Sequence, residues 1–172
     1  MIVNYITSDI KALIGSESGL IEAGHPVEAS EVRRFHHAVM DDAPRYWGDE
    51  AGRYGGPVAP PGFPVHAFRR ASNSPDPLNQ AGDPDFDGVS RSLREGLPAV
   101  NLPLPRLLNG GYEYELFRYA QVNDRIFVKS RYEDIYQRDG KTGPMVFIVI
   151  EDTYLNQRQE PLVKTKNTII LR

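Results

Sequence analysis

The run Met145-Val146-Phe147-Ile148-Val149-Ile150 decides the fold class of this chain, because it is the longest apolar stretch in the sequence. It is hydrophobic on both faces of an extended strand, which is typical of a strand at the centre of a sheet. Before it, apolar and charged residues alternate over residues 126–133, as in a half-buried strand. After it, residues 162–171 form a further candidate strand. Turn signals at Asp139-Gly140 and within residues 156–161 separate the three, which predicts an antiparallel meander.

The first half of the chain predicts helices rather than long strands. Ser30 is a favourable N-cap, and Val32, Phe35 and Val39 follow it at helical spacing. This helix should end before Pro44, because the residue that precedes a proline avoids the helical region. It is the clearest helix in the sequence.

Shorter elements complete the predicted fold. We expect a short helix over residues 8–15, a first strand over residues 20–27 and another strand over residues 112–119. The prolines in residues 58–70 favour a helix that begins near Pro61. This helix and the longer one before it are the elements available to cover the sheet. The predicted fold class is therefore α+β, with an antiparallel β-sheet of five or more strands wrapped around a central helix, which is the hot-dog layout.

Length and composition indicate one domain without covalent cross-links. The 172 residues fit a single domain over residues 1–172, with an insertion at about 72–98 that is rich in Pro, Gly and Asp. We expect this insertion to form a mobile lid over the substrate groove. The chain has no cysteine, which excludes structural disulfides and thiolate metal sites.

The distribution of charge argues against nucleic-acid and membrane partners. The net charge is −3, and the 20 basic and 23 acidic residues are interspersed without a basic stripe. The first residues lack the pattern of a secretory signal. The longest apolar run is far shorter than the roughly 20 residues of a membrane-spanning helix. We therefore expect a cytoplasmic protein that binds neither nucleic acid nor membrane.

The most informative stretch is Phe35-His36-His37-Ala38-Val39-Met40-Asp41-Asp42-Ala43-Pro44-Arg45-Tyr46. The dipeptide Ile14-Gly15 precedes this stretch. Four further pieces follow it in order: Val58-Ala59-Pro60-Pro61-Gly62-Phe63, Asn109-Gly110-Gly111-Tyr112-Glu113-Tyr114, Val122-Asn123-Asp124 and Asn156-Gln157-Arg158. In order and spacing, these motifs resemble the MaoC-like family over about residues 14–171. The resemblance is greatest to the N-terminal-type dehydratase domain of paired-subunit 3-hydroxyacyl-thioester dehydratases.

The resemblance implies a hot-dog fold, a thioester substrate on CoA or acyl carrier protein, and a dimeric or pseudo-dimeric assembly. Catalytic members of the family carry Asp-x-Asn-Pro-x-His, whose Asp and His add or remove water across the 2,3-bond. On that pattern this chain has Asp41, but Ala43 replaces the asparagine and Tyr46 replaces the histidine. A phenol with a pKa of about 10 is a poor general base near pH 7, whereas an imidazole titrates near 6.5. The departure matches the non-catalytic subunit of the paired enzymes.

Other residues could contribute to binding. His66 approaches a ligand if its segment is the central helix, but a surface or hydrogen-bonded histidine is the commoner case. Asn109-Gly110-Gly111 could cradle the thioester carbonyl or the pantetheine arm with backbone amides, or could be a turn entering a strand. Asp41, for its part, could instead terminate the helix through backbone hydrogen bonds.

The sequence predicts no metal site and no cofactor. Adjacent His36 and His37 should point about 100° apart on a helix, which predicts that they do not hold one metal ion together. The glycines at 55 and 56 lack the spacing of a phosphate-binding loop.

Two hypotheses of different kinds follow, with a third behind them. In the first, the chain is the substrate-binding subunit of a hydratase or dehydratase that interconverts 3-hydroxyacyl and 2-enoyl thioesters, and a second small MaoC-like subunit supplies Asp and His. In the second, it is a stand-alone homodimeric hydratase that uses Asp41 with His66 or Tyr46. In the third, it binds thioesters without a reaction.

Overall fold

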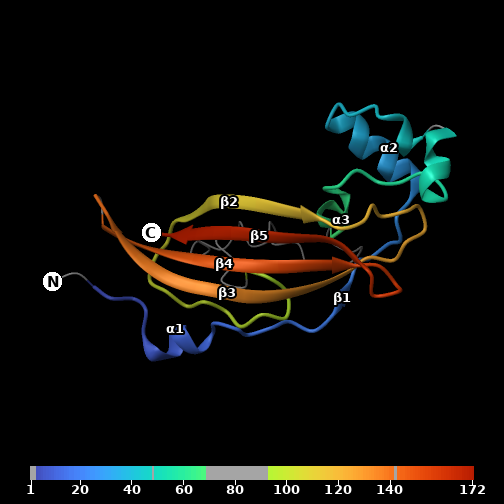
Figure 1. Cartoon of the computed structure of the whole chain (residues 1–172). Coiled ribbons are helices and arrows are strands. Elements are labelled where there is room, and N and C mark those ends of the chain that lie inside the picture. Colours follow the sequence, from blue (N-terminus) through green and yellow to red (C-terminus); the bar gives the residue numbers. More distant parts are fainter. Residues whose placement is uncertain (1–2, 48, 69–92, 142) are drawn as a thin grey trace, which may run out of the picture.

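The computed structural model describes residues 3–47, 49–68, 93–141 and 143–172 (Figure 1). The elements follow in the order α1 (Ser8–Ala12), β1 (Ile21–Glu22), α2 (Ala29–Ala38), η1 (Pro44–Tyr46), η2 (Asp49–Tyr54), α3 (Phe63–His66), β2 (Leu107–Leu116), β3 (Phe127–Gly140), β4 (Gly143–Leu155) and β5 (Pro161–Leu171). No helix in the described ranges is long and apolar enough to cross a membrane.

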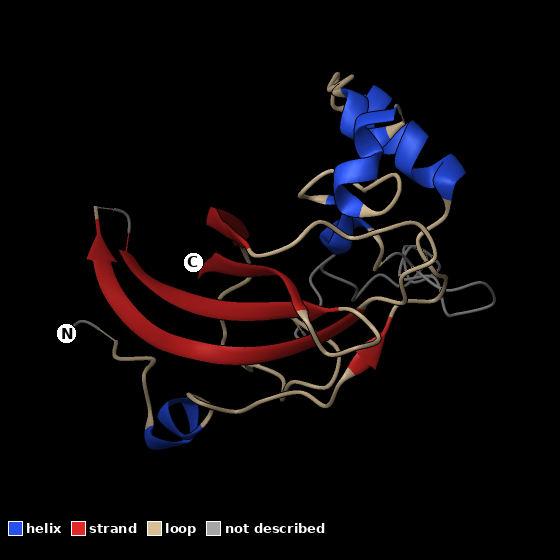
Figure 2. Cartoon of the chain, turned by 45° about the vertical axis from the view of Figure 1, so that its right-hand side comes forward, coloured by secondary structure: helices blue, strands red, loops and turns tan. Residues whose placement is uncertain are grey.

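The strands form one antiparallel sheet in the order β1-β3-β4-β5-β2. The three long strands β3, β4 and β5 are consecutive in both sequence and space, so the predicted meander is confirmed. The strand β4, which contains the apolar run at residues 145–150, lies in the centre of the sheet as predicted. The helix α3 begins two residues after Pro61. The predicted hot-dog fold is confirmed, and the sheet curves strongly (Figure 2).

In the part of the chain that the structure describes, one face of the sheet is more deeply buried than the other. On β4, Val146, Ile148 and Ile150 have no exposed surface, whereas the intervening Phe147 and Val149 are only partly buried. The alternation follows from the period of two in an extended strand. The second apolar face is therefore covered less completely than the first.

The long helix α2 differs from the prediction in its start and its place. It begins at Ala29 with Glu28 as N-cap, and no side chain caps it, so Ser30 lies inside the first turn. Figures 1 and 2 place α2 beyond one end of the sheet, not across its middle. Its buried Val32 packs with Phe63 of α3 in a core cluster at that end of the sheet.

The middle of the buried face is covered by residues that the sequence did not assign to this role. Leu97, Val100, Leu102 and Leu104 join Ile10 of α1 in a core cluster against the buried strand residues. Leu97 and its neighbours belong to the end of the predicted insertion at about 72–98. Of its described residues, 93–98, Leu97 is buried in this cluster and Leu93 packs against it. Residues 72–92 lie outside the described ranges, so the lid stays a prediction.

A buried ion pair fastens this covering segment to the sheet. Arg94 donates to both carboxylate oxygens of Asp152 over 2.9–3.1 Å, and Asp152 is completely buried on β4. Ser130 of β3 donates to the same carboxylate over 2.6 Å. Arg94 also reaches the side-chain oxygen of Asn167 on β5. A fully buried carboxylate is tolerated here because charged and polar donors surround it.

We predict that Arg94→Met lowers the free energy of unfolding by about 2–4 kcal/mol, because it leaves Asp152 buried without its counter-charge. Urea unfolding at pH 7 measures the change. The matched control is Arg131→Met, which removes the exposed pair with Glu151 on the opposite face and should cost no more than about 1 kcal/mol. Equal costs for the two substitutions would contradict the structural role of the buried pair.

Candidate functional site

A helix-terminating turn presents the first residue of the site. Helix α2 ends at Ala38, and Met40 adopts φ 56°, in the left-handed region. The backbone N–H of Asp41 then donates to the carbonyl of His36 over 2.9 Å, and that of Met40 to the carbonyl of His37 over 3.1 Å. This pair of bonds is a Schellman motif. It reverses the chain and fixes Asp41 immediately beyond the helix.

The structure brings the two predicted catalytic positions together. The buried hydroxyl group of Tyr46 donates a hydrogen bond of 2.8 Å to Oδ2 of Asp41. The other oxygen of Asp41 accepts from the backbone N–H of Ala43 over 3.2 Å. Arg45 donates to the Tyr46 hydroxyl over 3.1 Å and lies 3.8 Å from the carboxylate. Asp41 and Tyr46 therefore satisfy each other's polar groups.

These contacts shift the pKa values of both side chains away from pH 7. The hydrogen bond from Tyr46, with a smaller contribution from the Ala43 backbone, holds the pKa of Asp41 below its usual value. Burial, together with the hydrogen bond to Asp41, raises the pKa of Tyr46 above that of an ordinary phenol. At pH 7 the pair is a carboxylate and a neutral phenol, and neither is poised to exchange a proton.

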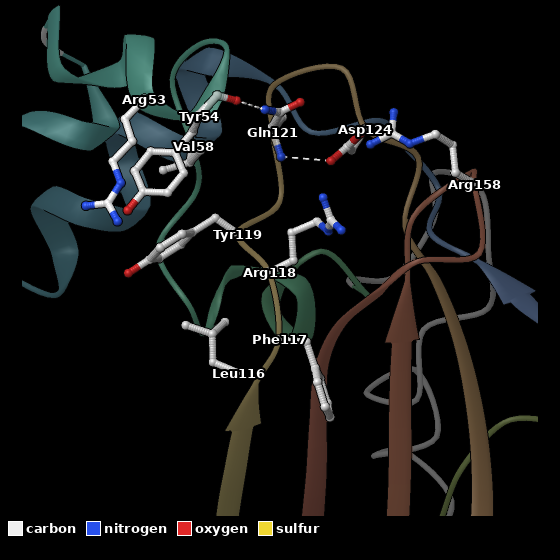
Figure 3. Close-up of a pocket in the computed structure, with 10 residues that line it drawn as sticks. All are labelled: Arg53, Tyr54, Val58, Leu116, Phe117, Arg118, Tyr119, Gln121, Asp124 and Arg158. Carbon is white, nitrogen blue, oxygen red and sulfur yellow. Dashed lines mark hydrogen bonds between the residues drawn. The ribbon is translucent and has the colours of Figure 1, made fainter.

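Beside this pair lies an open hollow of about 470 Å³, between η2 and the loop after β2 (Figure 3). The guanidinium group of Arg45 connects the two, since it lies 4.8 Å from the ring of Tyr46 and 5.8 Å from that of Tyr119. Tyr119 also makes an edge contact with Tyr54 at 5.3 Å. Guanidinium and aromatic groups define the wall: Arg53, Arg118, Arg158, Tyr54, Phe117 and Tyr119.

The hollow is electropositive on balance. Arg118 and Arg158 share one carboxylate, that of Glu160, at 3.4 and 2.8 Å. Arg53 is exposed and lies 5.6 Å from the ring of Tyr54. Asp124 is buried and accepts hydrogen bonds from the backbone of Gln121 and the side chain of Gln157. Three arginines thus face two carboxylates, which favours an anionic ligand with an apolar or ring-bearing part.

The other predicted binding residues lie elsewhere. Asn109, Gly110 and Gly111 form a bulge in β2, where Asn109 accepts a hydrogen bond from the Gly111 backbone over 3.1 Å. A Cβ on Gly110 would lie 2.9 Å from Ile170, so close strand packing explains this glycine. Leu116 lines the hollow, and the bulge lies about 17 Å away from it along the strand. A role of these residues in binding stays a prediction.

His66 is likewise separate from Asp41. Its ring packs 5.0 Å from that of Phe35, and Nε2 lies 3.9 Å from Glu31. Among the described residues, it does not line the hollow. A binding role for His66 also stays a prediction.

The expected separation of His36 and His37 is wrong. Their ring centroids lie 4.4 Å apart in an edge arrangement, because the side chains turn toward each other at the end of α2. The 100° between successive Cβ directions did not account for rotation about χ1 and χ2. Asp42 lies beside them, and one ligand atom from each of the three residues falls within 4.8 Å of the others.

A family model described as "FAS1-like, dehydratase domain region" matches residues 12–165. The chain belongs to this family. The match spans most of the sequence and includes both the Asp41–Tyr46 pair and the hollow, so the MaoC-like resemblance of the sequence is confirmed. No curated protein matches at a significant level.

Solved structures agree on the fold. The ChsH1–ChsH2 complex from Mycobacterium tuberculosis contains a chain that is 18% identical, with a TM-score of 0.67 over 95% of this chain and 86% of that one. The HadBC (3R)-hydroxyacyl-ACP dehydratase complex from the same organism gives 16% identity and a TM-score of 0.58, covering 92% and 96% of the two chains. A MaoC-like dehydratase from Rhodospirillum rubrum gives 19% and 0.58, covering 92% and 91%.

Sequence reasoning found the Asp41–Tyr46 pair but missed the hollow beside it. Arg45 lies within the quoted motif, between two aspartates and a tyrosine. This position was the available sequence signal that Arg45 belongs to the site. Arg53 and Arg118 are 65 residues apart in the sequence (118 − 53). Only the tertiary structure brings them to one surface.

Met40 generates a stability prediction. We expect Met40→Gly to raise the free energy of unfolding by about 1 kcal/mol, since glycine adopts the left-handed conformation without the Cβ clash. The Met40 side chain is 89% exposed, so little packing is lost. The control Ala38→Gly, two residues earlier and in helical backbone, should instead cost about 0.5–1 kcal/mol. Chemical denaturation distinguishes the two, and a destabilised Met40→Gly would contradict the turn geometry.

Tyr46→Phe tests the hydrogen bond to Asp41. We expect the pKa of Asp41 to rise toward its ordinary value, as measured by NMR titration of the carboxyl carbon. A depressed pKa contributes stability above the unfolded value of about 3.9 and loses it as the pH falls through the folded pKa. Tyr46→Phe should therefore destabilise the fold more at pH 7 than at pH 2. An equal rise in Tyr119→Phe would refute this assignment.

Proposed function

We propose that this chain is the substrate-binding half of a heteromeric hydratase or dehydratase that interconverts 3-hydroxyacyl and 2-enoyl thioesters. The observation that carries the proposal is the hydrogen bond of 2.8 Å from Tyr46 to Asp41, at the positions where catalytic family members carry His and Asp. A partner with the complete pair would perform the chemistry. The names of the ChsH1–ChsH2 and HadBC structures, both of them complexes of this fold, support a paired assembly.

The chemistry explains why Asp41 and Tyr46 are poorly suited to catalysis. Hydration of a 2-enoyl thioester needs one group to take a proton from water and another to deliver a proton to carbon. Efficient groups titrate near the working pH. The pKa of Asp41 is lowered by its hydrogen bond from Tyr46, and that of Tyr46 is raised by burial and the same bond. Both shifts oppose proton transfer near pH 7.

The stand-alone enzyme is supported less well. It requires His66 or Tyr46 to act with Asp41. His66 lies beside Glu31 and Phe35, while the Tyr46 hydroxyl is already engaged by Asp41 and Arg45. No observation among the described residues favours this alternative over the paired enzyme.

The hollow is the proposed place for the carrier of the acyl group. Its volume of about 470 Å³ falls within the usual range of roughly 300–1,000 Å³ for small-molecule sites. Both CoA and the phosphopantetheine arm of acyl carrier protein carry phosphate, which arginine binds through paired N–H donors. Arg53 and the Arg118–Arg158 pair supply these donors, and the rings of Tyr54 and Tyr119 supply a stacking surface.

The edge strand β2 is the proposed contact with the partner. It lies at the edge of the described sheet, and nearly all of its ten residues are exposed. Large apolar side chains are exposed along it and just beyond: Leu107, Leu108, Tyr114, Leu116 and Phe117. An uncovered apolar edge of this length is a site for strand addition. Its end borders the hollow, so a partner placed here would close the substrate site.

The purified chain should turn over a crotonyl thioester no faster than background. It should support turnover when mixed with a small MaoC-like protein that carries Asp-x-Asn-Pro-x-His, sought in an adjacent reading frame. In that complex, Asp41→Asn should change the rate only a few fold. Replacing the partner's catalytic aspartate should cost roughly 10²–10⁴-fold, as expected for a positioned acid–base group.

Two results would count against the proposal. Robust turnover by the chain alone, abolished by Asp41→Asn, would identify a stand-alone hydratase. Thioester binding by calorimetry without turnover in either preparation would identify a binding module.

A further inference from the structure

Three side chains at the C-terminal end of α2 form a cluster that the proposed function does not use. They are His36, His37 and Asp42, and one ligand atom from each lies within 4.8 Å of the others. His36 is buried, whereas His37 and Asp42 are exposed. The neighbouring Asp41 carboxylate is not part of the cluster, because it accepts hydrogen bonds from Tyr46 and from the Ala43 backbone.

The buried nitrogen of His36 is unusual. Its Nδ1 atom has no hydrogen-bond partner among the described residues, although the side chain is only 3% exposed. The nearest carboxylate oxygen, on Asp42, lies 3.5 Å away, beyond the 2.7–3.2 Å of a good N–H···O bond. A buried polar atom without a partner is costly and calls for an explanation.

A metal ion accounts for this spacing. Two ligands on a tetrahedral ion with bonds of 2.0–2.1 Å lie about 3.4 Å apart. The separation of 3.5 Å between His36 Nδ1 and Asp42 Oδ1 matches this value. Any longer separation to His37 can be closed by rotation of its exposed side chain, since exposed rotamers interconvert rapidly.

The fold holds two of the ligands in place. The ring of His36 stacks on that of Tyr46 at 5.8 Å, with an angle of 26° between them. The Schellman turn at Met40 reverses the chain and returns Asp42 to the end of the helix that carries both histidines. Only His37 must adjust to complete the set.

We infer that His36, His37 and Asp42 bind a divalent first-row transition metal, with Zn²⁺ as the probe of choice. Two imidazoles and one carboxylate suit zinc, and the exposure of two ligands leaves a fourth position open to water. The inference is independent of the proposed function, because it rests on no residue of the hollow and on no thioester chemistry.

Calorimetric titration of the untagged chain with Zn²⁺ at pH 7.5 tests this site. We expect one ion per chain in the wild type, and binding weakened at least tenfold in His37→Gln and in Asp42→Asn. Both residues are exposed, so these variants should fold normally, and thermal unfolding verifies that they do. Binding should also weaken at pH 5.5, because metal ions compete with protons for their ligands.

The matched controls are His25→Gln and Asp134→Asn, two exposed residues outside the cluster, which should leave binding unchanged. A second measurement reports on the buried ligand directly: Zn²⁺ should shift the ring resonances of His36 in NMR spectra of the wild type but not of Asp42→Asn. Absence of stoichiometric binding, full binding by both ligand variants, or equal losses in the controls would overturn the site.

Discussion

The fold depends on a single constraint: a strongly curved sheet must bury one of its faces, and, among the described residues, only the short helices α1 and α3 lie against its middle and end to do so. The buried face of β4 therefore receives irregular backbone around Leu97 and Val100, in addition to α3. Irregular backbone brings polar groups to the core, and these need partners. The Tyr132 hydroxyl donates to the carbonyl of Pro98, and Arg94 donates to that of Leu93. The pair of Arg94 with Asp152 also ties the covering segment to the centre of the sheet.

A second constraint shapes the site. The Schellman turn after α2 places two consecutive aspartates on opposite sides of the chain, so that Asp41 meets Tyr46 while Asp42 meets His36. Tyr46 also stacks on His36, so it contacts both Asp41 and the histidine that lies beside Asp42. One short turn thus serves the incomplete acid–base pair and the histidine cluster, and a change in either is expected to affect the other through Tyr46.

Much of the sheet could be predicted from the sequence. Residues 126–133 and 162–171 show the hydrophobic pattern of a half-buried strand, and residues 145–150 form the continuous apolar run of a central strand. The cover of the sheet could not be predicted. Residues 97–104 gave too weak a signal, because the apolar alternation is confined to Val100, Leu102 and Leu104 and the prolines at 98 and 103 disfavour a strand. Their burial depends on contacts with distant strands. The start of α2 at Ala29, ahead of Ser30, was missed for a related reason, since packing of Val32 on Phe63 holds the helix without a side-chain cap.

The candidate site divides in the same way. Asp41 and Tyr46 are close in sequence, so a local motif sufficed to find them. The arginines of the hollow come from η2, the loop after β2 and the β4–β5 turn, and no local pattern unites them.

The substitution of tyrosine for histidine has a consequence beyond the loss of a base. A phenol is longer than an imidazole, and here its hydroxyl reaches one oxygen of Asp41 while the Ala43 backbone holds the other. The phenol, held in addition by Arg45 and by the ring of His36, occupies the position next to Oδ2 of the Asp41 carboxylate. Asp41 and Tyr46 thus form a hydrogen-bonded pair that carries one negative charge beside the open, arginine-lined hollow. In the proposed paired enzyme, these residues would shape the binding of the thioester, while the partner preserves the geometry of proton transfer.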